Sequence, residues 1–407
     1  MSTKKSNKLF GEFKIKQLKQ ALLFFPSALV FFEIVTYLSN DMYLPSLPAI
    51  KRDLNISHDL SQYTLSLWFL GSASMQLFIG PLSDRYGRKI ILMIGALCFV
   101  LASFICAFTS EIAWMFFGRF IQGCTVCCVI VGGYAAIHET YDNLTAIKII
   151  ALMGSIAVLA PAFGPLLGAI ILEWSNWRMI FHFLGGMGLI SFIWIGLVMP
   201  ETRKHTVYIN FSAILKDYIR IACRPRFLAY TLPFCFLFIT SIAWIVESPF
   251  IIIETYQKSP LDFGIIQLLV FGSFMIGAQT TRILINERII MKIIHYGLSI
   301  AMLSSGVLLL CMFMKKTELY YVVGSMMLIS FGTSMAYGPL NRLAIDAGTE
   351  PMGRRVAIFS SYMSIFGLLS TLLVTFANDK TIQNLSIIIA SGTLISFCLS
   401  YLLRRFR

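Results

Sequence analysis

Long apolar runs recur along this chain from residue 22 to residue 403, separated by short polar segments and by Pro or Gly. Each run holds about 20 residues, which is enough for one α-helix to cross a hydrocarbon core of about 30 Å. The pattern therefore predicts twelve membrane-spanning helices, at residues 22–45, 60–82, 90–110, 113–138, 145–172, 178–199, 227–253, 262–282, 292–314, 319–344, 355–378 and 384–403.

The longest polar segment inside the chain, residues 200–226, separates the sixth predicted helix from the seventh. Two six-helix halves joined by a basic linker are typical of transporters built from parallel repeats about an axis normal to the membrane. We therefore predict an all-α membrane protein. Its expected parts are a cytoplasmic tail at 1–21, an N-terminal half at 22–199, a cytoplasmic linker at 200–226, a C-terminal half at 227–403 and a cytoplasmic C-terminus at 404–407.

The composition excludes a soluble globular protein. Of the 407 residues, 57% are hydrophobic and only 13% are charged, against about 25% charged in an average soluble domain. The basic segment 1–21 has no small-residue cleavage site after a short apolar core, so we expect a retained tail rather than a signal peptide.

Lys and Arg residues are distributed unevenly between the two sides of the predicted membrane. Because basic segments stay in the cytoplasm, the basic tail and linker place both termini there. The net charge of +13 thus reflects membrane topology, and it does not indicate binding to nucleic acid. The loops on the opposite side contain only Lys51, Arg52, Arg178, Lys258, Lys315, Lys316 and Lys380.

The sequence indicates neither a metal centre nor a catalytic site. Cys124, Cys127 and Cys128 are close in sequence, but no His or carboxylate lies within a turn of them. Small-residue helix packing is the favoured interpretation of this cluster, and metal binding is the alternative. The sequence has no glycine-rich loop of the ATP-binding or dinucleotide-binding type. We expect a protein that is not an enzyme and needs no cofactor.

The loop after the second predicted helix reads GPLSDRYGRK at residues 80–89. Its glycines permit a tight turn and close helix approach, its aspartate is available to cap or pair across helices, and its basic residues hold the turn at the inner interface. A plain positive-inside hairpin would explain the basic residues but not the ordered string. The residues to which we assign a conformational role are Gly80, Asp84, Arg85, Gly87 and Arg88.

This string resembles the loop 2–3 signature of the major facilitator superfamily, and GRFIQG at residues 118–123 is similar to that family's R-x-x-Q-G motif. We expect the glycines and prolines of the fifth predicted helix to let it bend and pack closely against a partner from the other half. Ordinary membrane packing is the alternative. That helix is similar to the motif of the drug/proton antiporter branch, through Gly154, Pro161, Gly164, Pro165 and Gly168.

A narrower resemblance, to the Bcr/CflA multidrug/proton antiporters, covers essentially the whole chain. It rests on residues 31–45, 133–139 and 243–249, and it is weaker in the C-terminal half, which has no convincing copy of the loop 2–3 string. The resemblance implies the twelve-helix major facilitator fold in a bacterial inner membrane. It also implies export of lipophilic, cationic drugs in exchange for protons, with the proton gradient as the energy source.

Two carboxylates fall inside the first predicted helix. Counted at 1.5 Å per residue, Glu33 lies roughly 18 Å into the membrane and Asp41 about 12 Å further. Eight residues place the two about 80° apart around the helix, so both can line one cavity, with Tyr37 between them. A carboxylate at this depth costs at least a few kcal/mol. When protonated, both acids are neutral and can lie in an apolar cavity. We expect a lipophilic cation to take the place of their protons there.

Arg119, in the fourth predicted helix, matches the depth of Asp41, roughly 9 Å against roughly 6 Å below the outer boundary. We expect the two to interact directly or through water, with Arg119 stabilising the ionised form of Asp41. Glu33 has no basic partner within helical reach, so its burial favours the neutral form. The alternative for either acid is a purely structural hydrogen bond or ion pair that locks the helix.

Two further acids are candidate site residues. Glu139, at the inner end of the fourth helix, is either a cytoplasmic proton relay or an interfacial carboxylate. Glu247 departs from the resemblance, because the related antiporters carry an amide there, and we expect it to be a third acid facing the cavity. Weaker candidates for the C-terminal wall are Gln279, Asn341, Arg342 and Asp346.

Two other functions stay open at the level of sequence. One is proton-coupled export of a metabolite such as a siderophore or sugar, in which Arg119 and Arg342 would bind anionic cargo. The other is a membrane receptor or scaffold that moves nothing, against which the buried carboxylates and the antiporter-type motif argue. The expected partners are small-molecule substrates, protons and the lipid bilayer, and nothing in the sequence indicates an oligomer.

Overall fold

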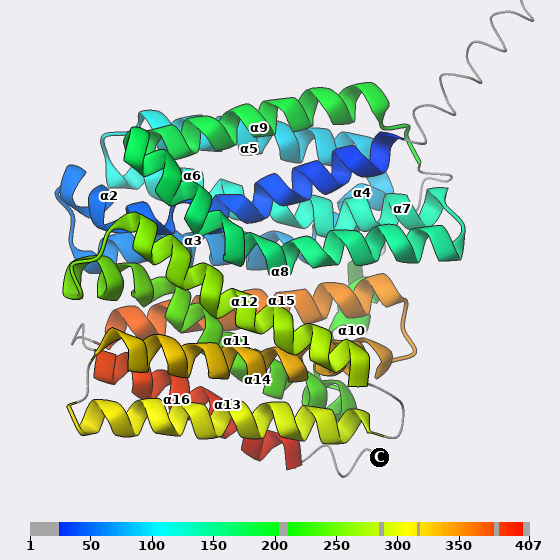
Figure 1. Ribbon diagram of the computed structural model, residues 1–407. Helices are drawn as coiled ribbons and strands as arrows, with labels where there is room; N and C mark the ends of the chain where they lie inside the picture. The colour runs from blue at the N-terminus through cyan, green and yellow to red at the C-terminus, as the bar shows by residue number, and fades with distance from the viewer. Residues whose placement is uncertain (1–23, 203–210, 285–288, 316–317, 378–381, 402–407) are drawn as a thin grey trace, which may run out of the picture.

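The computed structural model describes residues 24–202, 211–284, 289–315, 318–377 and 382–401. Within these ranges the chain is almost entirely helical and contains no strand, which confirms the all-α prediction (Figure 1). Gly154 belongs to a helix, but residues 154–158 are among those whose surroundings lie outside the described part of the structure.

The long helices match the twelve predicted spans in order, and the described ends lie within four residues of the predicted ones. In the first half they are helix 24–41, α3 (His58–Met75) with α4 (Ile79–Tyr86), α5 (Arg88–Phe108), α6 (Ile112–Cys127) continued by the π-helical η2 (Cys128–Gly133) and α7 (Tyr134–Thr140), α8 (Asn143–Trp174) and α9 (Trp177–Val198). In the second half they are α11 (Pro225–Pro249) continued by the π-helical η3 (Phe250–Thr255), α12 (Pro260–Leu284), α13 (Ile290–Phe313), α14 (Leu319–Asp346), α15 (Met352–Phe376) and α16 (Ile382–Ser400).

Length and hydropathy alone mark nine helices of the described chain as able to cross a membrane. A tenth is added when α3 and α4, which meet at a 53° bend, are taken as one span.

Several helices begin where a side chain accepts a backbone hydrogen bond. Asp142 accepts from Leu144 and Thr145 at the start of α8, and Ser57 and Asn176 act in the same way for α3 and α9.

Two short helices lie where only loops were predicted. α2 (Leu47–Asp53), preceded by the 3₁₀ turn η1 (Leu44–Ser46), caps one end of the molecule, and α10 (Phe211–Ala222) occupies the linker at the opposite end (Figure 1). The Tyr218 hydroxyl of α10 donates to the carbonyl of Leu77 in the first half, and Asp217 pairs with Arg354 of the second half. α10 therefore bonds to both halves. Below, the two ends of the molecule are called the α2 end and the α10 end.

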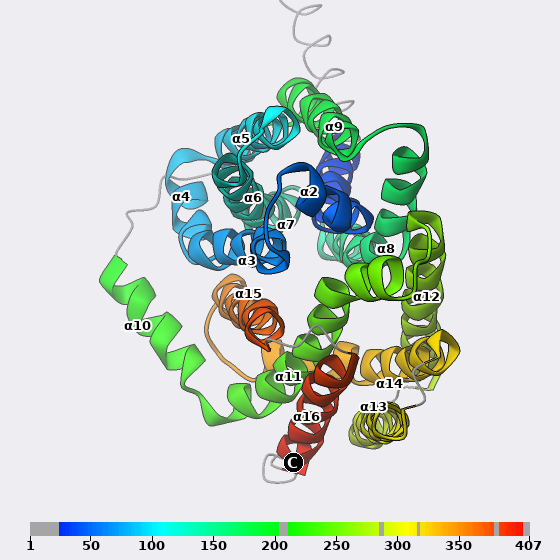
Figure 2. The same cartoon turned by 90° about the vertical axis from the view of Figure 1, so that its left-hand side faces the viewer.

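The helices form two bundles that face each other across a central plane. Figure 2 shows helix 24–41 and α3–α9 on one side of it and α11–α16 on the other. α3 packs on α15 and α8 packs on α12 across this plane. The α3–α15 contact includes hydroxyl hydrogen bonds between Ser66 and Thr371, at 2.7 Å, and between Ser72 and Ser364, at 3.0 Å.

Gly164 and Gly168 of α8 do not face the other bundle, so the prediction that they pack against a partner from the other half is wrong. A methyl group on Gly164 would lie 2.7 Å from Cβ of Asp41, and one on Gly168 would overlap the carbonyl oxygen of Met42. Both glycines thus bring α8 against the end of helix 24–41 in the same half. Across the plane, the close approach depends instead on Gly264 of α12, where a methyl group would lie 2.8 Å from Cα of Leu166.

Gly168→Ala should destabilise the protein because its methyl group meets backbone, which cannot rotate away. Overpacking of this kind costs about 1–3 kcal/mol. Gly186→Ala in α9 is the matched control, since a methyl group there meets nothing within 4 Å, and helix propensity alone should make it neutral or stabilising by up to about 1 kcal/mol. Thermal unfolding of the detergent-purified variants measures both. Equal unfolding temperatures for the two variants would contradict the packing described here.

Candidate functional site

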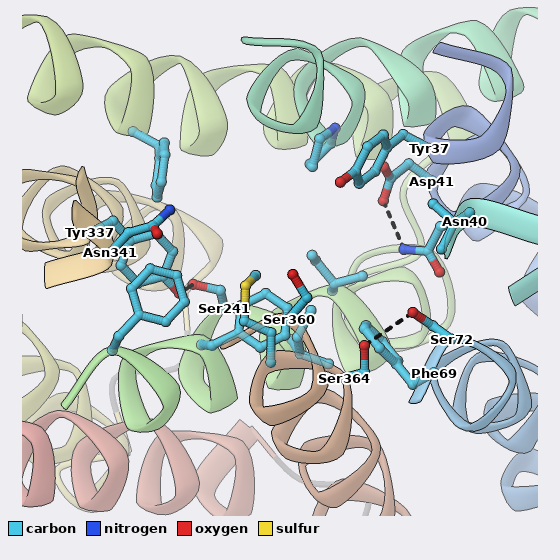
Figure 3. Close-up of a pocket in the computed structure, with 18 of the residues that line it drawn as sticks. Tyr37, Asn40, Asp41, Phe69, Ser72, Ser241, Tyr337, Asn341, Ser360 and Ser364 are labelled. Atoms are coloured by element: carbon cyan, nitrogen blue, oxygen red, sulfur yellow. Dashed lines mark hydrogen bonds between the residues drawn. The ribbon is translucent and has the colours of Figure 1, made fainter. Parts of the chain in front are cut away.

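A cavity of about 430 Å³ lies between the two bundles (Figure 3). Its volume falls within the range of small-molecule sites, roughly 300–1,000 Å³. Apolar and aromatic side chains dominate its wall, and polar groups interrupt it at a few points. Its lining residues include Tyr37, Asn40, Asp41, Trp68, Phe69, Ser72, Gln76, Pro161, Phe234, Phe238, Ser241, Phe271, Phe274, Thr281, Tyr337, Asn341, Ser360, Met363 and Ser364.

Helix 24–41 contributes the one acidic group among the described lining residues. The side chains of Tyr37 and Asp41 point from this helix toward the cavity (Figure 3). Asp41 is only 2% exposed, and its carboxylate accepts one hydrogen bond from the Asn40 amide at 3.2 Å. The structure thus places Asp41 and Tyr37 together in the cavity wall, as the sequence predicts.

The second half contributes an aromatic wall. The ring of Tyr337 stacks on Phe234 at 4.3 Å between centroids and meets Phe274 edge-on at 5.5 Å. The Tyr337 hydroxyl lies 3.4 Å from the hydroxyl of Ser241. Aromatic faces attract planar apolar groups and cations. This wall and the Asp41 carboxylate therefore suit a ligand that is both apolar and positively charged.

Several polar atoms in the wall have no hydrogen-bond partner among the described residues. They are both side-chain polar atoms of Gln76, the indole N–H of Trp68 and the side-chain oxygens of Asn40 and Asn341. Buried polar groups are normally paired. These atoms therefore offer donors and acceptors to a molecule inside the cavity. Asn341 is thus placed in the C-terminal wall, as predicted, but the exposed pair Arg342 and Asp346 and the exposed Gln279 are not.

Glu33 lies two turns along the same helix from Asp41 and outside the cavity lining, so the prediction that both acids line one cavity is wrong for Glu33. It is fully buried and accepts a hydrogen bond from the Tyr134 hydroxyl at 3.0 Å, while its second oxygen has no partner among the described residues. Tyr134 directly follows the π-helical turn η2, a type of turn that is frequent at functional sites. Among the described residues, the Tyr134 hydroxyl is the one group that bonds to the Glu33 carboxylate.

Arg119 forms no direct ion pair with Asp41, so the first form of that prediction is wrong. Its Nη1 donates to the carbonyl of Ser39 and to Oε1 of Gln122, both at 2.7 Å, and its guanidinium lies 4.1 Å from the centre of the Tyr43 ring. The depth was predicted correctly, but the direction was not. Ser39 and Asp41 are two residues apart, and Arg119 bonds to the backbone carbonyl of Ser39 rather than to the Asp41 carboxylate. Arg119 is not among the lining residues of the cavity.

The predicted motif of residues 80–89 forms a compact polar cluster at the α10 end. Gly87 joins α4 to α5 with φ +107°, a backbone conformation that only glycine adopts readily. The Arg88 guanidinium lies 2.5 Å from Asp84, and the Arg88 amide donates to the carboxylate of Glu201 at 2.9 Å. Gly80 lies near Val131 of η2, where a methyl group would reach 3.5 Å.

Glu139 belongs to this cluster and not to the cavity lining. Its carboxylate pairs with Arg88 at 2.9 Å and accepts from the Thr202 hydroxyl at 2.9 Å. This geometry supports the interfacial alternative over the proton relay. Arg85 extends to the surface over the ring of Tyr86.

Glu247 does not face the cavity either, and that prediction is wrong. It is 6% exposed near the end of α11, where it accepts from the Gln62 amide at 2.5 Å and lies 3.5 Å from Nε2 of His58. Sequence reasoning missed both partners. The available signal was their i, i+4 spacing, which puts His58 and Gln62 on one face of α3.

Cys127 and Cys128 are buried in helix contacts. The Cys127 thiol donates to the carbonyl of Ser72 at 3.2 Å, and the Cβ of Cys128 lies 2.8 Å from the position of a methyl group on Gly95. Both observations fit the packing interpretation of the cysteine cluster. No group of three or more His, Cys, Asp or Glu suited to a metal occurs in the part of the chain that the structure describes.

The sequence profile of the Major Facilitator Superfamily matches residues 29–372. The chain belongs to this superfamily. Membership establishes the twelve-helix major facilitator fold and identifies the chain as a multi-pass membrane transporter rather than an enzyme. It agrees with the order of helices along the described residues.

Three curated relatives narrow the similarity. The chloramphenicol resistance protein CraA of Acinetobacter baumannii is 29% identical over 374 residues, or 91% of each chain. The multidrug resistance protein MdtM of Escherichia coli O157:H7 is 30% identical over 334 residues, or 82% of each chain. The multidrug transporter MdfA of Yersinia pestis is 30% identical over 338 residues, or 83% of each chain.

Arg119→Lys should destabilise the protein, because a lysine ammonium cannot reproduce the two hydrogen bonds and the stacking on Tyr43 together. Leaving buried partners of a charge unsatisfied costs at least about 2 kcal/mol. Arg342→Lys is the matched control, since the Arg342 side chain is 82% exposed. Thermal unfolding in detergent compares the two. An Arg119→Lys protein as stable as the control would show that the observed contacts do not hold the guanidinium.

Proposed function

We propose that this protein exports lipophilic, cationic drugs in exchange for protons. The observation that carries the proposal is an apolar, aromatic cavity between the two bundles with a single described carboxylate, Asp41, in its wall. The relatives CraA, MdtM and MdfA bear names of drug-resistance proteins and multidrug transporters, which supports drug efflux as the function.

Asp41 binds either a proton or the charged part of the drug. Protonated, it is neutral and suits an apolar wall. Ionised, it needs a counter-charge, because a carboxylate in the membrane interior is costly. A cation in the cavity supplies that charge, with the aromatic wall of Phe234 and Tyr337 on its other side. Proton and drug therefore exclude each other, and this exclusion couples their opposite movements.

Glu33 holds a second proton deeper in the same half. Its burial favours the neutral acid until the surroundings change, and it outweighs the single hydrogen bond from Tyr134, which favours the carboxylate. Because helix 24–41 carries both acids, a movement of this helix alters the environment of both. Glu33 is then a proton carrier that does not contact the drug.

The transport cycle alternates access to the cavity from the two sides of the membrane. The two ion pairs between described residues of the bundles, Lys51 with Glu254 and His58 with Glu247, both lie at the α2 end. The cavity lining extends toward the α10 end through Gln76 and Asn341. We assign this conformation to the inward-facing state, with the α2 end outside. Rocking of one bundle against the other then opens the α2 end.

The cellular setting follows from the same reasoning. The protein lies in a bacterial inner membrane with both termini in the cytoplasm, as the distribution of Lys and Arg predicts. It works as a monomer on the proton gradient without a bound cofactor. Export of an anionic metabolite fits less well. The described cavity lining contains no Lys, Arg or His, so Arg119 is not part of it, and Arg342 is exposed.

The test is transport by the purified full chain in proteoliposomes with an imposed pH difference. We expect uptake of a lipophilic cation such as tetraphenylphosphonium to be driven by the gradient. Asp41→Asn should reduce this uptake to the level of protein-free liposomes, and Glu33→Gln should uncouple it from the gradient. Glu173→Gln, at an exposed acid near the end of α8, is the matched control and should transport normally.

Gradient-driven uptake that survives in the Asp41→Asn, Glu33→Gln double variant would contradict the proposal. Binding without uptake by the unmodified chain would instead favour a receptor. Uptake of anionic but not cationic compounds would favour the metabolite exporter.

A further inference from the structure

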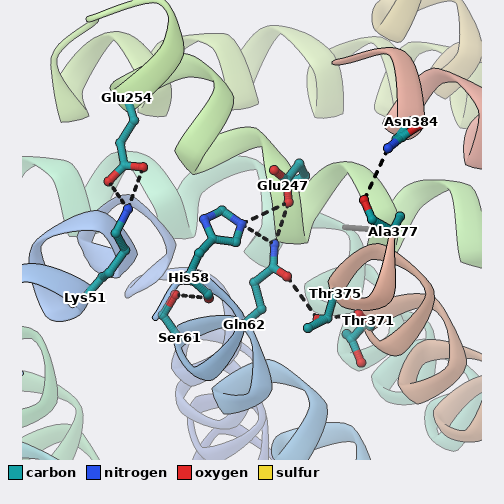
Figure 4. Close-up of polar contacts among 10 residues, drawn as sticks. All are labelled: Lys51, His58, Ser61, Gln62, Glu247, Glu254, Thr371, Thr375, Ala377 and Asn384. Carbon is teal, nitrogen blue, oxygen red and sulfur yellow. Dashed lines mark hydrogen bonds and ion pairs between the residues drawn. The ribbon is translucent and has the colours of Figure 1, made fainter. Parts of the chain in front are cut away.

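A second buried polar cluster joins the two bundles at the α2 end, away from the cavity (Figure 4). His58 and Gln62 come from α3, Glu247 comes from α11 and Thr375 comes from α15. The Gln62 amide nitrogen lies 2.5 Å from the Glu247 carboxylate and 2.9 Å from Nε2 of His58, and its oxygen accepts from the Thr375 hydroxyl at 2.9 Å. One glutamine thus links three helices.

The two titratable groups of this cluster lie close together and away from water. Glu247 is 6% exposed and His58 is 4% exposed, and their nearest charged atoms are 3.5 Å apart. The ring of Phe250 covers the imidazole at 4.0 Å between centroids. A carboxylate buried in this way is costly unless a positive charge lies beside it.

The other charged groups around the pair do not supply that charge. Lys51 of α2 lies 5.8 Å from the centre of the Phe250 ring, but it is paired at 2.8 Å with Glu254 of η3. Asp59, the next residue of α3, carries the same sign as Glu247. Near the cluster, α15 contributes the hydroxyls of Thr371 and Thr375 and no charge within its described residues. Among the described residues, His58 is the one basic side chain placed to neutralise Glu247.

We propose that His58 and Glu247 together bind one proton when the α2 end is closed and release it when that end opens. With the proton present, the pair is either an imidazolium beside a carboxylate or a neutral imidazole beside a carboxylic acid. Both forms neutralise the buried acid, and the proton belongs to the pair. Without the proton, a charged carboxylate is buried beside a neutral ring, and hydration of Glu247 favours separation of the bundles.

The direction of the effect follows from this linkage. Acid at the α2 end stabilises the closed end and returns the transporter to the conformation described above, whereas alkali favours opening. Because the pair is absent from the cavity lining, its proton controls the conformational equilibrium and is not exchanged for the drug. The inference rests on the proposed function only in requiring that the α2 end opens.

The experiment measures opening directly, without a transport assay. Spin labels carried by noncanonical amino acids at the exposed positions Glu111 and Lys258, one on each bundle at the α2 end, leave the nine native cysteines in place. Double electron–electron resonance in lipid nanodiscs gives the ratio of open to closed populations. We expect this ratio to rise on the order of tenfold between about pH 5.5 and about pH 8, a range that brackets the ordinary pKa of histidine.

Four variants assign the effect to the pair. Glu247→Gln should stay closed at both pH values, because no buried charge remains. His58→Gln should stay open at both, at the level of the unmodified chain at high pH. The double variant should resemble Glu247→Gln. Lys51→Gln with Glu254→Gln removes the neighbouring ion pair and should shift the ratio equally at both pH values. Repeating the set with Asp41→Asn and Glu33→Gln removes any contribution of the other acids.

A pH response that persists unchanged in His58→Gln, or a Glu247→Gln protein that opens more than the unmodified chain, would overturn the inference. A single closed population at every pH would overturn it as well. A pH response in the distances combined with no drug transport would overturn the proposed function alone.

Discussion

The cost of a charge in the membrane interior is the constraint on which this structure depends. Among the described residues, one nitrogen of Arg119 donates to the carbonyl of Ser39 and to the amide oxygen of Gln122, and one oxygen of Glu33 accepts from the hydroxyl of Tyr134. The other two guanidinium nitrogens of Arg119 and the second oxygen of Glu33 have no hydrogen-bond partner there. Asp41 has only a weaker bond from Asn40 and the cavity beside it. In the proposed function it is the acid that a mobile partner neutralises, either a proton or a cation. The cavity is then a site of exchange and not of static binding.

The polar contacts between the bundles along α3 are individually weak. Along α3, the hydrogen bonds from Ser66 and Ser72 to α15 are single hydroxyl contacts, each with a modest net contribution of about 1 kcal/mol. Within the described residues, α3 makes a charged contact with the other bundle at its α2 end, where His58 faces Glu247. α3 thus runs from the cavity wall to the closed α2 end of the molecule. In the proposed transport cycle, this continuity links the charge state at one end of α3 to access at the other.

The order of the helices was predictable because hydropathy and loop charge are local properties of the sequence. Asp41 and Tyr37 were predictable as cavity residues because they share a helix and a face. The errors came from contacts between helices. The bond from Arg119 to Ser39 rather than to Asp41, the aim of Gly164 and Gly168 toward helix 24–41, and the partners of Glu247 all depend on packing between segments distant in sequence. The helix α10 was missed because a twelve-residue amphipathic segment resembles a polar linker.

The central claim is that a proton and a cationic drug compete for one carboxylate. Proton release on drug binding tests it most directly. The purified full chain, in weakly buffered detergent solution, is mixed with tetraphenylphosphonium while binding and pH are followed together. The account predicts that binding releases protons and that Asp41→Asn abolishes the release. Binding of the cation with no release of protons, or with the same release in Asp41→Asn, would contradict it.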